Sequence, residues 1–517
     1  MGINSENKQV AFNIVAQLTA FVVNFAINFL LTPFIIERVG SEAYGFVSLG
    51  NNFVDYASLA AVALNSMAGR FITIKIHQKD FDSARKYYSS VIIANIVISL
   101  VLSVPAALLL IFITKVVRIN ASLVGDIRLL WLFLFFHLII GLISAVSVAG
   151  LFASNRIDIQ SKRNIEALFL KAAILSLLFL LLPTHVWYIG FATAIGTLFY
   201  ALRTLQASHQ FYPQLRLSRK DFSIPHIREL LHSGVWNVVS RVGSIALTEL
   251  DLLMTNWLVG EAAMGTLAIA KFVPNRVVAM IGYIVAVFLP QLTILYAKND
   301  KSHFLAVARS NMRILLFFDI ILYGILYAYA DVFFALWLPE GAEDIQQLYI
   351  LSCITIIGCL ISAVIQVIFN IFTVTDKLKF SSLSVVGTGL ASIVMTILLV
   401  KTTSLGIYAI AGVSVALCML RNIFIIVPYG AKCVGLPWYG FYPDLLRNII
   451  SVAGSICVSL GMKRILAFPI TWAGFFCSCI ITGCVLLILD YFIVLRKEER
   501  KLLCNKIAFW RRGRDRN

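Results

Sequence analysis

Two rows of polar side chains interrupt otherwise apolar segments, and the second row repeats the first. The first row is Asn13, Gln17, Asn24 and Asn28. The second begins 220 residues after Asn13 and is Ser233, Asn237, Ser244 and Thr248. At about 100° per residue, the members of a row share one helical face. An unpaired amide in hydrocarbon costs on the order of several kcal/mol, so both faces are predicted to line a hydrated interior.

The segment that holds the second row also carries an arginine that is able to bind an anion. A central Arg in a membrane span costs at least about 2.5–3.5 kcal/mol, so Arg241 is expected to face a cavity or a partner. The alternative is an ion pair with Asp251 or Glu249. Contact along one helix is expected to be awkward, because the axial separation is about 12–15 Å. The cavity is the favoured interpretation.

The second apolar segment of each repeat places polar groups at matching positions. Asn51 and Asp55 in the first copy correspond to Lys271 and Asn275 in the second. Arg276 lies about 140° from Lys271 on an ideal helix, so Lys271 is the stronger candidate for the cavity. Arg276 could instead snorkel or brace another helix, and Asn51 could simply join two helices.

A cationic second half that faces an amide-rich first half suits a ligand with phosphates and sugar hydroxyls. The predicted cavity residues are Arg241, Lys271, Arg276, Asn237, Asn275, Asn24, Asn28, Asn51 and Arg421. The candidates for proton or ion coupling are Asp55, Asp251 and Asp319. Arg421 and Asp319 are isolated in apolar runs, where an interhelical contact is the more common role.

Motifs of enzymes are missing from the sequence. It has no phosphate-cradling glycine loop with Lys-Ser or Lys-Thr, no metal-binding His pair and no nucleophile elbow. The nine cysteines are scattered without metal-ligand spacing. We therefore predict a protein that is not an enzyme and that needs neither a cofactor nor a metal.

The composition is that of a polytopic all-α membrane protein. Of 517 residues, 60% are hydrophobic and 13% are charged, whereas soluble domains carry about 25% charged residues. Fourteen apolar segments are each long enough to span a bilayer. The net charge of +17 does not indicate nucleic acid, because Lys and Arg are concentrated in alternate loops. This positive-inside pattern predicts that both termini are cytoplasmic.

The repeat defines the predicted organisation. Two six-helix lobes are expected at 1–206 and 232–431, joined by a cytoplasmic linker at 207–231. Two extra transmembrane helices follow at 432–495. The basic tail 496–517 is expected to lie on anionic lipid at the inner surface, and a solvated tail is the alternative. Because six spans separate the copies, the repeats have the same orientation.

Five stretches resemble the polysaccharide-transport family of the multidrug, oligosaccharidyl-lipid and polysaccharide exporter superfamily. They are LLTPFIIERVGSEAYGFVSL (30–49), its copy LDLLMTNWLVGEAAMGTLAI (250–269), AIAKFVPNRV (268–277), LPQLTILYAK (289–298) and LFASNRIDIQ (151–160). The resemblance implies a bacterial inner-membrane flippase that moves undecaprenyl-pyrophosphate-linked oligosaccharides outward for O-antigen, capsule, exopolysaccharide or teichoic acid assembly. It also implies a monomer of two lobes around a central cavity, which works beside a polysaccharide polymerase and chain-length machinery.

The resemblance favours alternating access, with Arg241 and Lys271 holding the pyrophosphate-sugar headgroup while the prenyl tail stays in lipid. The related lipid II flippase has a cationic first helix that this chain lacks, which argues against lipid II as the cargo. Two other classes compete. A drug–cation antiporter of the superfamily usually has twelve helices and an acidic cavity. A polysaccharide polymerase or membrane glycosyltransferase typically carries a large external loop and needs no repeat.

Overall fold

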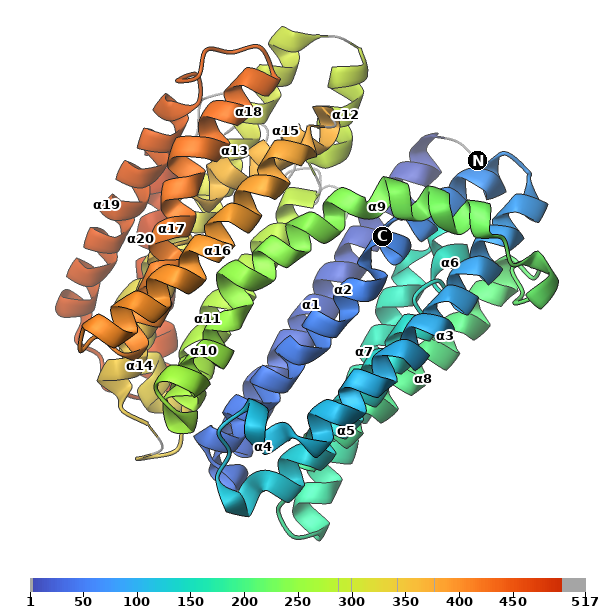
Figure 1. Cartoon of the computed structure of the whole chain (residues 1–517). Coiled ribbons are helices and arrows are strands. Elements are labelled where there is room, and N and C mark those ends of the chain that lie inside the picture. The colour runs from blue at the N-terminus through green and yellow to red at the C-terminus, as the bar shows by residue number, and fades with distance from the viewer. Residues whose placement is uncertain (1–2, 287, 299, 342, 376, 495–517) are drawn as a thin grey trace, which may run out of the picture. The chain divides into compact units, whose positions relative to one another are not determined.

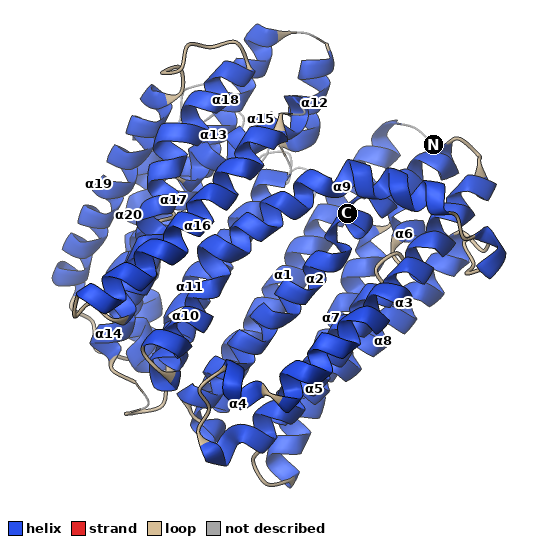
Figure 2. Ribbon diagram, viewed as in Figure 1, coloured by secondary structure: helices blue, strands red, loops and turns tan. Residues whose placement is uncertain are grey.

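The computed structural model describes residues 3–286, 288–298, 300–341, 343–375 and 377–494. Within these ranges the chain forms helices joined by turns and loops, with no strand (Figure 2). This confirms the predicted all-α class. The predicted basic tail, 496–517, lies outside the described residues.

The helix boundaries follow the internal repeat. The first copy contains α1 (Ile3–Val39), α2 (Ser41–His77), α3 (Phe81–Ile111), α4 (Ile113–Val116), α5 (Val124–Ile143), α6 (Ala149–Ala153), α7 (Ile157–Leu181) and α8 (Trp187–Phe211). The second contains α9 (Ile224–Ser244), α10 (Leu250–Leu258), α11 (Glu261–Ala286), α12 (Leu289–Ala297), α13 (Lys301–Trp337), α14 (Ile345–Ile357), α15 (Ser362–Thr375), α16 (Leu378–Thr402), α17 (Ile407–Arg421) and α18 (Val427–Cys433). The last two helices are α19 (Tyr442–Leu466) and α20 (Trp472–Ile493).

Local signals at equivalent positions explain this correspondence. Gly40 and Gly260 precede α2 and α11 with positive φ angles of 85° and 143°, a conformation that favours glycine. Asp80 and Asp300 cap α3 and α13, and each carboxylate accepts a hydrogen bond from the backbone N–H three residues later. Both pairs are 220 residues apart, which is the offset of the polar rows.

The number of spans differs from the prediction. Among the described residues, eleven helices are long and apolar enough to cross a membrane, or twelve if α14 and α15, which are bent by 44°, form one span. Each of the fourteen predicted segments coincides with helix, but α8 and the α9–α10 region are not among the eleven. The α9–α10 region is interrupted at Ile245–Glu249, and α10 is nine residues long. The count of fourteen is not confirmed.

The chain divides into two compact units. The first is Met1–Ile269 with Val385–Ile410, and the second is Ala270–Ser384 with Ala411–Asn517. The division differs from the predicted lobes because α9 packs against α2 and so belongs to the first unit. The part of α16 from Val385 on joins α9 there, since a Cβ on Gly243 would lie 2.6 Å from a Val385 methyl. The lobe boundaries drawn from the repeat stay a prediction.

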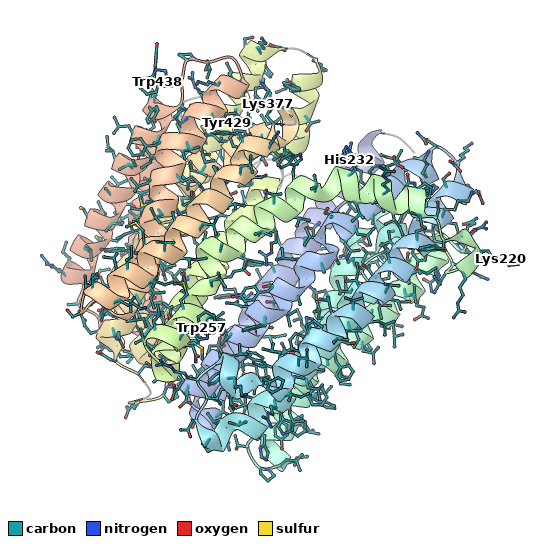
Figure 3. The ribbon with its side chains drawn as sticks, in the orientation of Figure 1. Lys220, His232, Trp257, Lys377, Tyr429 and Trp438 are labelled. Carbon is teal, nitrogen blue, oxygen red and sulfur yellow. The ribbon has the colours of Figure 1, made fainter. Side chains whose placement is uncertain are left out.

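In the first unit, α2 packs against α3, α5 and α9, α1 packs against α7, and α8 packs against α5 and α7 (Figure 1). The predicted linker is attached to α3, where Arg85 pairs with Asp221 at 2.7 Å. The linker is also shorter than predicted, because α9 begins at Ile224 and so includes residues 224–231 of the predicted linker. In α10, the Trp257 ring N–H donates to the Val116 carbonyl at 2.6 Å (Figure 3).

The second unit is organised around α13, a helix of 37 residues. It packs against α12, α14 and α15 and against the two helices that lie outside the repeat, α19 and α20. Tyr323 and Leu315 are fully buried in this core, and Lys463 of α19 pairs with Asp331 of α13 at 2.6 Å. The extra helices are therefore an integral part of the second unit.

Candidate functional site

Arg241, on the helix that carries the second polar row, lies where α9 approaches α2. Gly234 makes this approach possible, since a Cβ there would come within 2.1 Å of the Ala63 carbonyl oxygen. One turn further along, the Asn237 amide donates to the Ser66 hydroxyl at 3.1 Å. The crossing brings polar side chains of the two helices together.

Arg241 forms two ion pairs at this crossing. Its guanidinium lies 2.7 Å from a Glu249 carboxylate oxygen and 3.3 Å from an Asp55 carboxylate oxygen. The three side chains remain 34% (Arg241), 19% (Glu249) and 48% (Asp55) exposed. The arginine is thus paired but still accessible, and this cluster joins a predicted cavity residue to a predicted coupling residue.

Contact between Arg241 and Glu249 is expected to be awkward along one helix, but the structure contains it. Residues Ile245–Glu249, between α9 and α10, form a π-helix. A π-helix bonds i to i+5 and fits more residues into a turn, so it rotates Glu249 toward the face of Arg241. The two long side chains then cover the remaining axial distance.

Side chains of α2 support this π-helix. The Glu249 carbonyl accepts hydrogen bonds from the Asn52 amide at 2.7 Å and from the Tyr56 hydroxyl at 2.9 Å. Asn52 and Tyr56 are not among the site residues predicted from the sequence. Their only signal was adjacency to Asn51 and Asp55, on a neighbouring face of the same helix.

The other predicted residues of the first unit have mixed roles. Asn28 donates to the backbone and side-chain oxygens of Asn24 at 2.8 and 3.1 Å, and both are half-buried on α1. Asn51 is exposed and donates to a carbonyl of its own helix. Asp251 is 4% exposed and lies within α10. These positions allow Asn24, Asn28 and Asn51 to reach a ligand, while Asp251 is buried.

Asn13 does not line a hydrated interior, contrary to the prediction for the whole row. It is 4% exposed, and its amide donates to the backbone carbonyl and the side chain of Asn155, both at 2.9 Å. Its oxygen accepts from the Asp158 backbone N–H at 3.1 Å. The amide is satisfied by the turn that leads into α7, so it joins helices and needs no water.

The remaining candidates belong to the second unit. Lys271 is half-buried on α11, and Asn275 is exposed on the same helix. The Arg276 guanidinium lies over the Phe272 ring, 5.5 Å from its centroid. Arg421 is 7% exposed and donates to the Asn422 side chain at 2.8 Å. Since Arg241 lies in the first unit and Lys271 in the second, their joint site stays a prediction.

Asp319 is fully buried at an interruption between two helices. One carboxylate oxygen accepts from the Ser362 hydroxyl at 2.6 Å, and the other has no hydrogen-bond partner among the described residues. Ser362 begins α15 after the bend from α14, and the Tyr323 hydroxyl nearby is also buried without a described partner. A carboxylate in such a place requires a proton or a bound cation to offset its desolvation.

Comparisons with known proteins agree with this architecture. No family model matches the chain. EpsK, an uncharacterised membrane protein of Bacillus subtilis (strain 168), is 24% identical over 494 residues, which are 96% of this chain and 97% of EpsK. An inward closed structure of the lipid II flippase MurJ gives a TM-score of 0.65 at 14% identity, and covers 93% of this chain and 98% of MurJ.

An inward-facing multidrug resistance transporter of the MATE family gives a TM-score of 0.61 at 16% identity, covering 81% of this chain and 98% of the transporter. That transporter belongs to the MOP superfamily, the exporter superfamily predicted above. The chain therefore has the fold of MOP-superfamily transporters and is a multi-pass membrane protein. The predicted fold is confirmed.

Proposed function

We propose that this protein is a flippase that moves an undecaprenyl-pyrophosphate-linked oligosaccharide from the inner to the outer leaflet of the bacterial plasma membrane. The cargo serves the assembly of a surface polysaccharide. Both termini are cytoplasmic in this proposal, and the chain works as a monomer. A polysaccharide polymerase and chain-length machinery receive the cargo, and no cofactor or nucleic acid takes part.

The observation that carries this proposal is the accessible guanidinium of Arg241 within a membrane-spanning bundle. Such a group is retained against its insertion cost when it serves a ligand or a pathway. The coverage of known folds supports a flippase over a drug exporter, since MurJ covers 93% of the chain and the MATE transporter 81%. The helices α19 and α20 lengthen the chain beyond the six-plus-six repeat.

The two unequal ion pairs give Arg241 a way to bind and release a phosphate. Asp55 is the more distant partner at 3.3 Å and the more exposed, so an incoming phosphate displaces it first. Glu249, at 2.7 Å and less exposed, keeps the guanidinium oriented. An arginine bonds phosphate in a bidentate manner, and the displaced Asp55 is then free to take up a proton. This exchange links binding to a proton gradient.

Other residues complete the proposed cycle. Lys271 supplies a second cation, and Arg276 and Arg421 are further candidates to bind phosphate. Amides of both halves exchange hydrogen bonds with the sugars. These amides are Asn24, Asn28, Asn51, Asn237 and Asn275. Asp319 and Asp251 are the further candidates for ion coupling. The prenyl tail stays in lipid while the headgroup crosses by alternating access.

A deletion strain tests this function. Loss of the protein is expected to leave lipid-linked oligosaccharide on the inner leaflet, measured by its protection from an external glycosidase. Wild-type protein restores export, Arg241→Ala and Lys271→Ala do not, and all reach normal levels in the membrane. Full export by both variants rejects the site, whereas unchanged leaflet distribution in the deletion strain rejects the function.

A cation-coupled drug antiporter is the second candidate. The favouring observation is that two carboxylates, Asp55 and Glu249, surround a single Arg241, so the cluster is net negative. This function predicts that the deletion strain becomes sensitive to cationic dyes while its surface polysaccharide is unchanged. Loss of polysaccharide with unchanged dye tolerance excludes it.

A further inference from the structure

A pocket lies inside the first unit, and the residues of the Arg241 cluster do not line it. It has a volume of ≈ 480 Å³ and lies between α5, α7 and α8. Its lining includes His137, Lys171, Asn164, Gln160, Thr197 and Tyr200. No Asp or Glu is among the residues that line it. The pocket therefore carries a cation and several hydrogen-bonding groups but no carboxylate.

The three helices hold the walls of this pocket in fixed positions. Gly196 lets α8 approach α7, since a Cβ there would lie 3.3 Å from the Ala167 carbonyl oxygen. A ring nitrogen of His137 and the Thr197 hydroxyl are hydrogen-bonded at 2.6 Å. The pocket is thus a built feature of one unit, and its shape does not depend on the other.

Open space borders Gly141, which is one of the lining residues. A Cβ at this position would meet nothing within 4 Å. A larger side chain can therefore enter the pocket from α5 without displacing the helices. The glycine thus leaves room for a ligand beside His137, one helical turn away.

The chemistry of the lining selects the ligand. α7 is a candidate membrane span, and a lysine within a span is rare unless it serves a ligand, a pathway or a partner. The donors of Lys171, Asn164 and Gln160 suit phosphate oxygens, while Ala167 and Leu168 supply an apolar wall. The occupant must therefore be both anionic and compatible with the bilayer.

The geometry points to a binding site for the phosphate headgroup of an anionic membrane lipid, with Lys171 as its cationic contact. The acyl chains remain in the bilayer beside α5 and α7. This site is separate from the cluster at Arg241 and does not rest on the proposed function. A soluble phosphate shares the same headgroup chemistry, so the test must separate the two sources.

Native mass spectrometry and thermal melting of the full chain in neutral detergent test this site. Phosphatidylglycerol is expected to remain bound and to raise Tm, whereas phosphatidylcholine is not. Lys171→Met is expected to weaken phosphatidylglycerol binding about tenfold, in line with the loss of one charge-assisted contact. Gly141→Phe, which fills the pocket and keeps every polar group, is expected to abolish it.

Gly125→Phe is the matched control, because Gly125 is also on α5 and also borders open space, but does not line the pocket. It should bind phosphatidylglycerol like the wild type. If Lys171→Met does not fold, Lys171→Arg should keep binding while Gly141→Phe loses it. Equal binding by Gly141→Phe and Gly125→Phe overturns the site. Stabilisation by inorganic phosphate without any effect of phosphatidylglycerol overturns the lipid assignment.

Discussion

The two copies of the opening helix carry the same row of polar positions but differ in backbone. In the first copy α1 is one uninterrupted helix of 37 residues. In the second copy the equivalent stretch is divided into α9, the π-helix Ile245–Glu249 and α10. The amides of the first row make hydrogen bonds within α1 and to the turn before α7. The helix that carries the second row instead presents Arg241 to Asp55 and Glu249.

This difference shows how one copy of a duplicated helix can come to place charged groups beside one another. Regular α-helical hydrogen bonds keep α1 a scaffold element. A single π-turn in the other copy changes the register after Arg241 and brings a carboxylate to it, and such turns occur frequently at functional sites. Asn52 and Tyr56 of α2 hold the turn through the Glu249 carbonyl. In the proposed cycle, the second copy therefore supplies the group that binds phosphate.

The largest effects are expected from deleting one residue at equivalent positions of the two copies. Deletion of Ala246 removes the extra residue of the π-turn, so the helix becomes a regular α-helix. The variant protein should fold, but it should lose both the Arg241–Glu249 ion pair and export. Deletion of Ala26 shifts the register of a regular helix by about 100° and should prevent stable insertion. Protein levels and export report the two outcomes. Equal behaviour of the two deletions contradicts the comparison.

Removal of the arginine should separate its structural role from its role in transport. Arg241→Ala leaves Glu249 partly buried without its cation, which costs about 1–3 kcal/mol before allowance for its exposure. Adding Glu249→Gln should restore Tm but not export. Thr19→Ala, on α1 of the first copy, removes a hydroxyl that donates to the Val15 carbonyl of the same helix, and should change neither strongly. Recovery of export in the double variant would show that Arg241 serves the fold only.

Two equivalent glycines at the start of α2 and α11 offer a third test. A Cβ on Gly45 would lie 2.8 Å from the Gly265 Cα, and a Cβ on Gly265 would lie 2.6 Å from the Ser41 carbonyl oxygen. Gly45→Ala should therefore lower stability by about 1–3 kcal/mol. Gly69→Ala, on the same helix in open space, is the control and should be neutral. Thermal melting distinguishes them.

The smallest effect is expected at the helix caps. Hydrogen bonds from the Ser83 and His303 N–H groups hold the pKa of Asp80 and of Asp300 below the ordinary value. Because the folded pKa is depressed, the caps stabilise the protein above the unfolded pKa and lose this contribution as pH falls through the folded one. Asp80→Asn and Asp300→Asn should slightly flatten the acid decline of Tm. An unchanged decline in both variants would show that the caps contribute nothing.

Much of the fold could be predicted because it depends on local signals. Long apolar runs, the glycines before α2 and α11, and the repeat of polar positions all lie within short stretches of sequence. That Arg241 has a partner or faces a cavity could also be predicted, since a charged side chain in an apolar run needs one or the other. The π-turn could not, because it depends on Asn52 and Tyr56, which are almost 200 residues away in the chain.

The role of individual amides could not be read from the sequence for a similar reason. Asn13 and Asn24 belong to the same row, but only Asn13 meets a turn, the one at Asn155, that satisfies its amide. The part of α16 from Val385 on belongs to the first unit, and this likewise follows from close contacts at Gly243 and Gly389 with distant partners. Periodicity identifies a polar face, and tertiary contacts decide which members of that face remain available.

The central claim is that Arg241 exchanges a carboxylate for the phosphate of the cargo during transport. The most direct measurement is the rate at which purified protein in liposomes moves a fluorescent, short-chain polyprenyl-pyrophosphate oligosaccharide between leaflets. Arg241→Ala should reduce this rate to that of empty liposomes, and Arg241→Lys should retain part of it. Movement by Arg241→Ala at the wild-type rate would contradict the account.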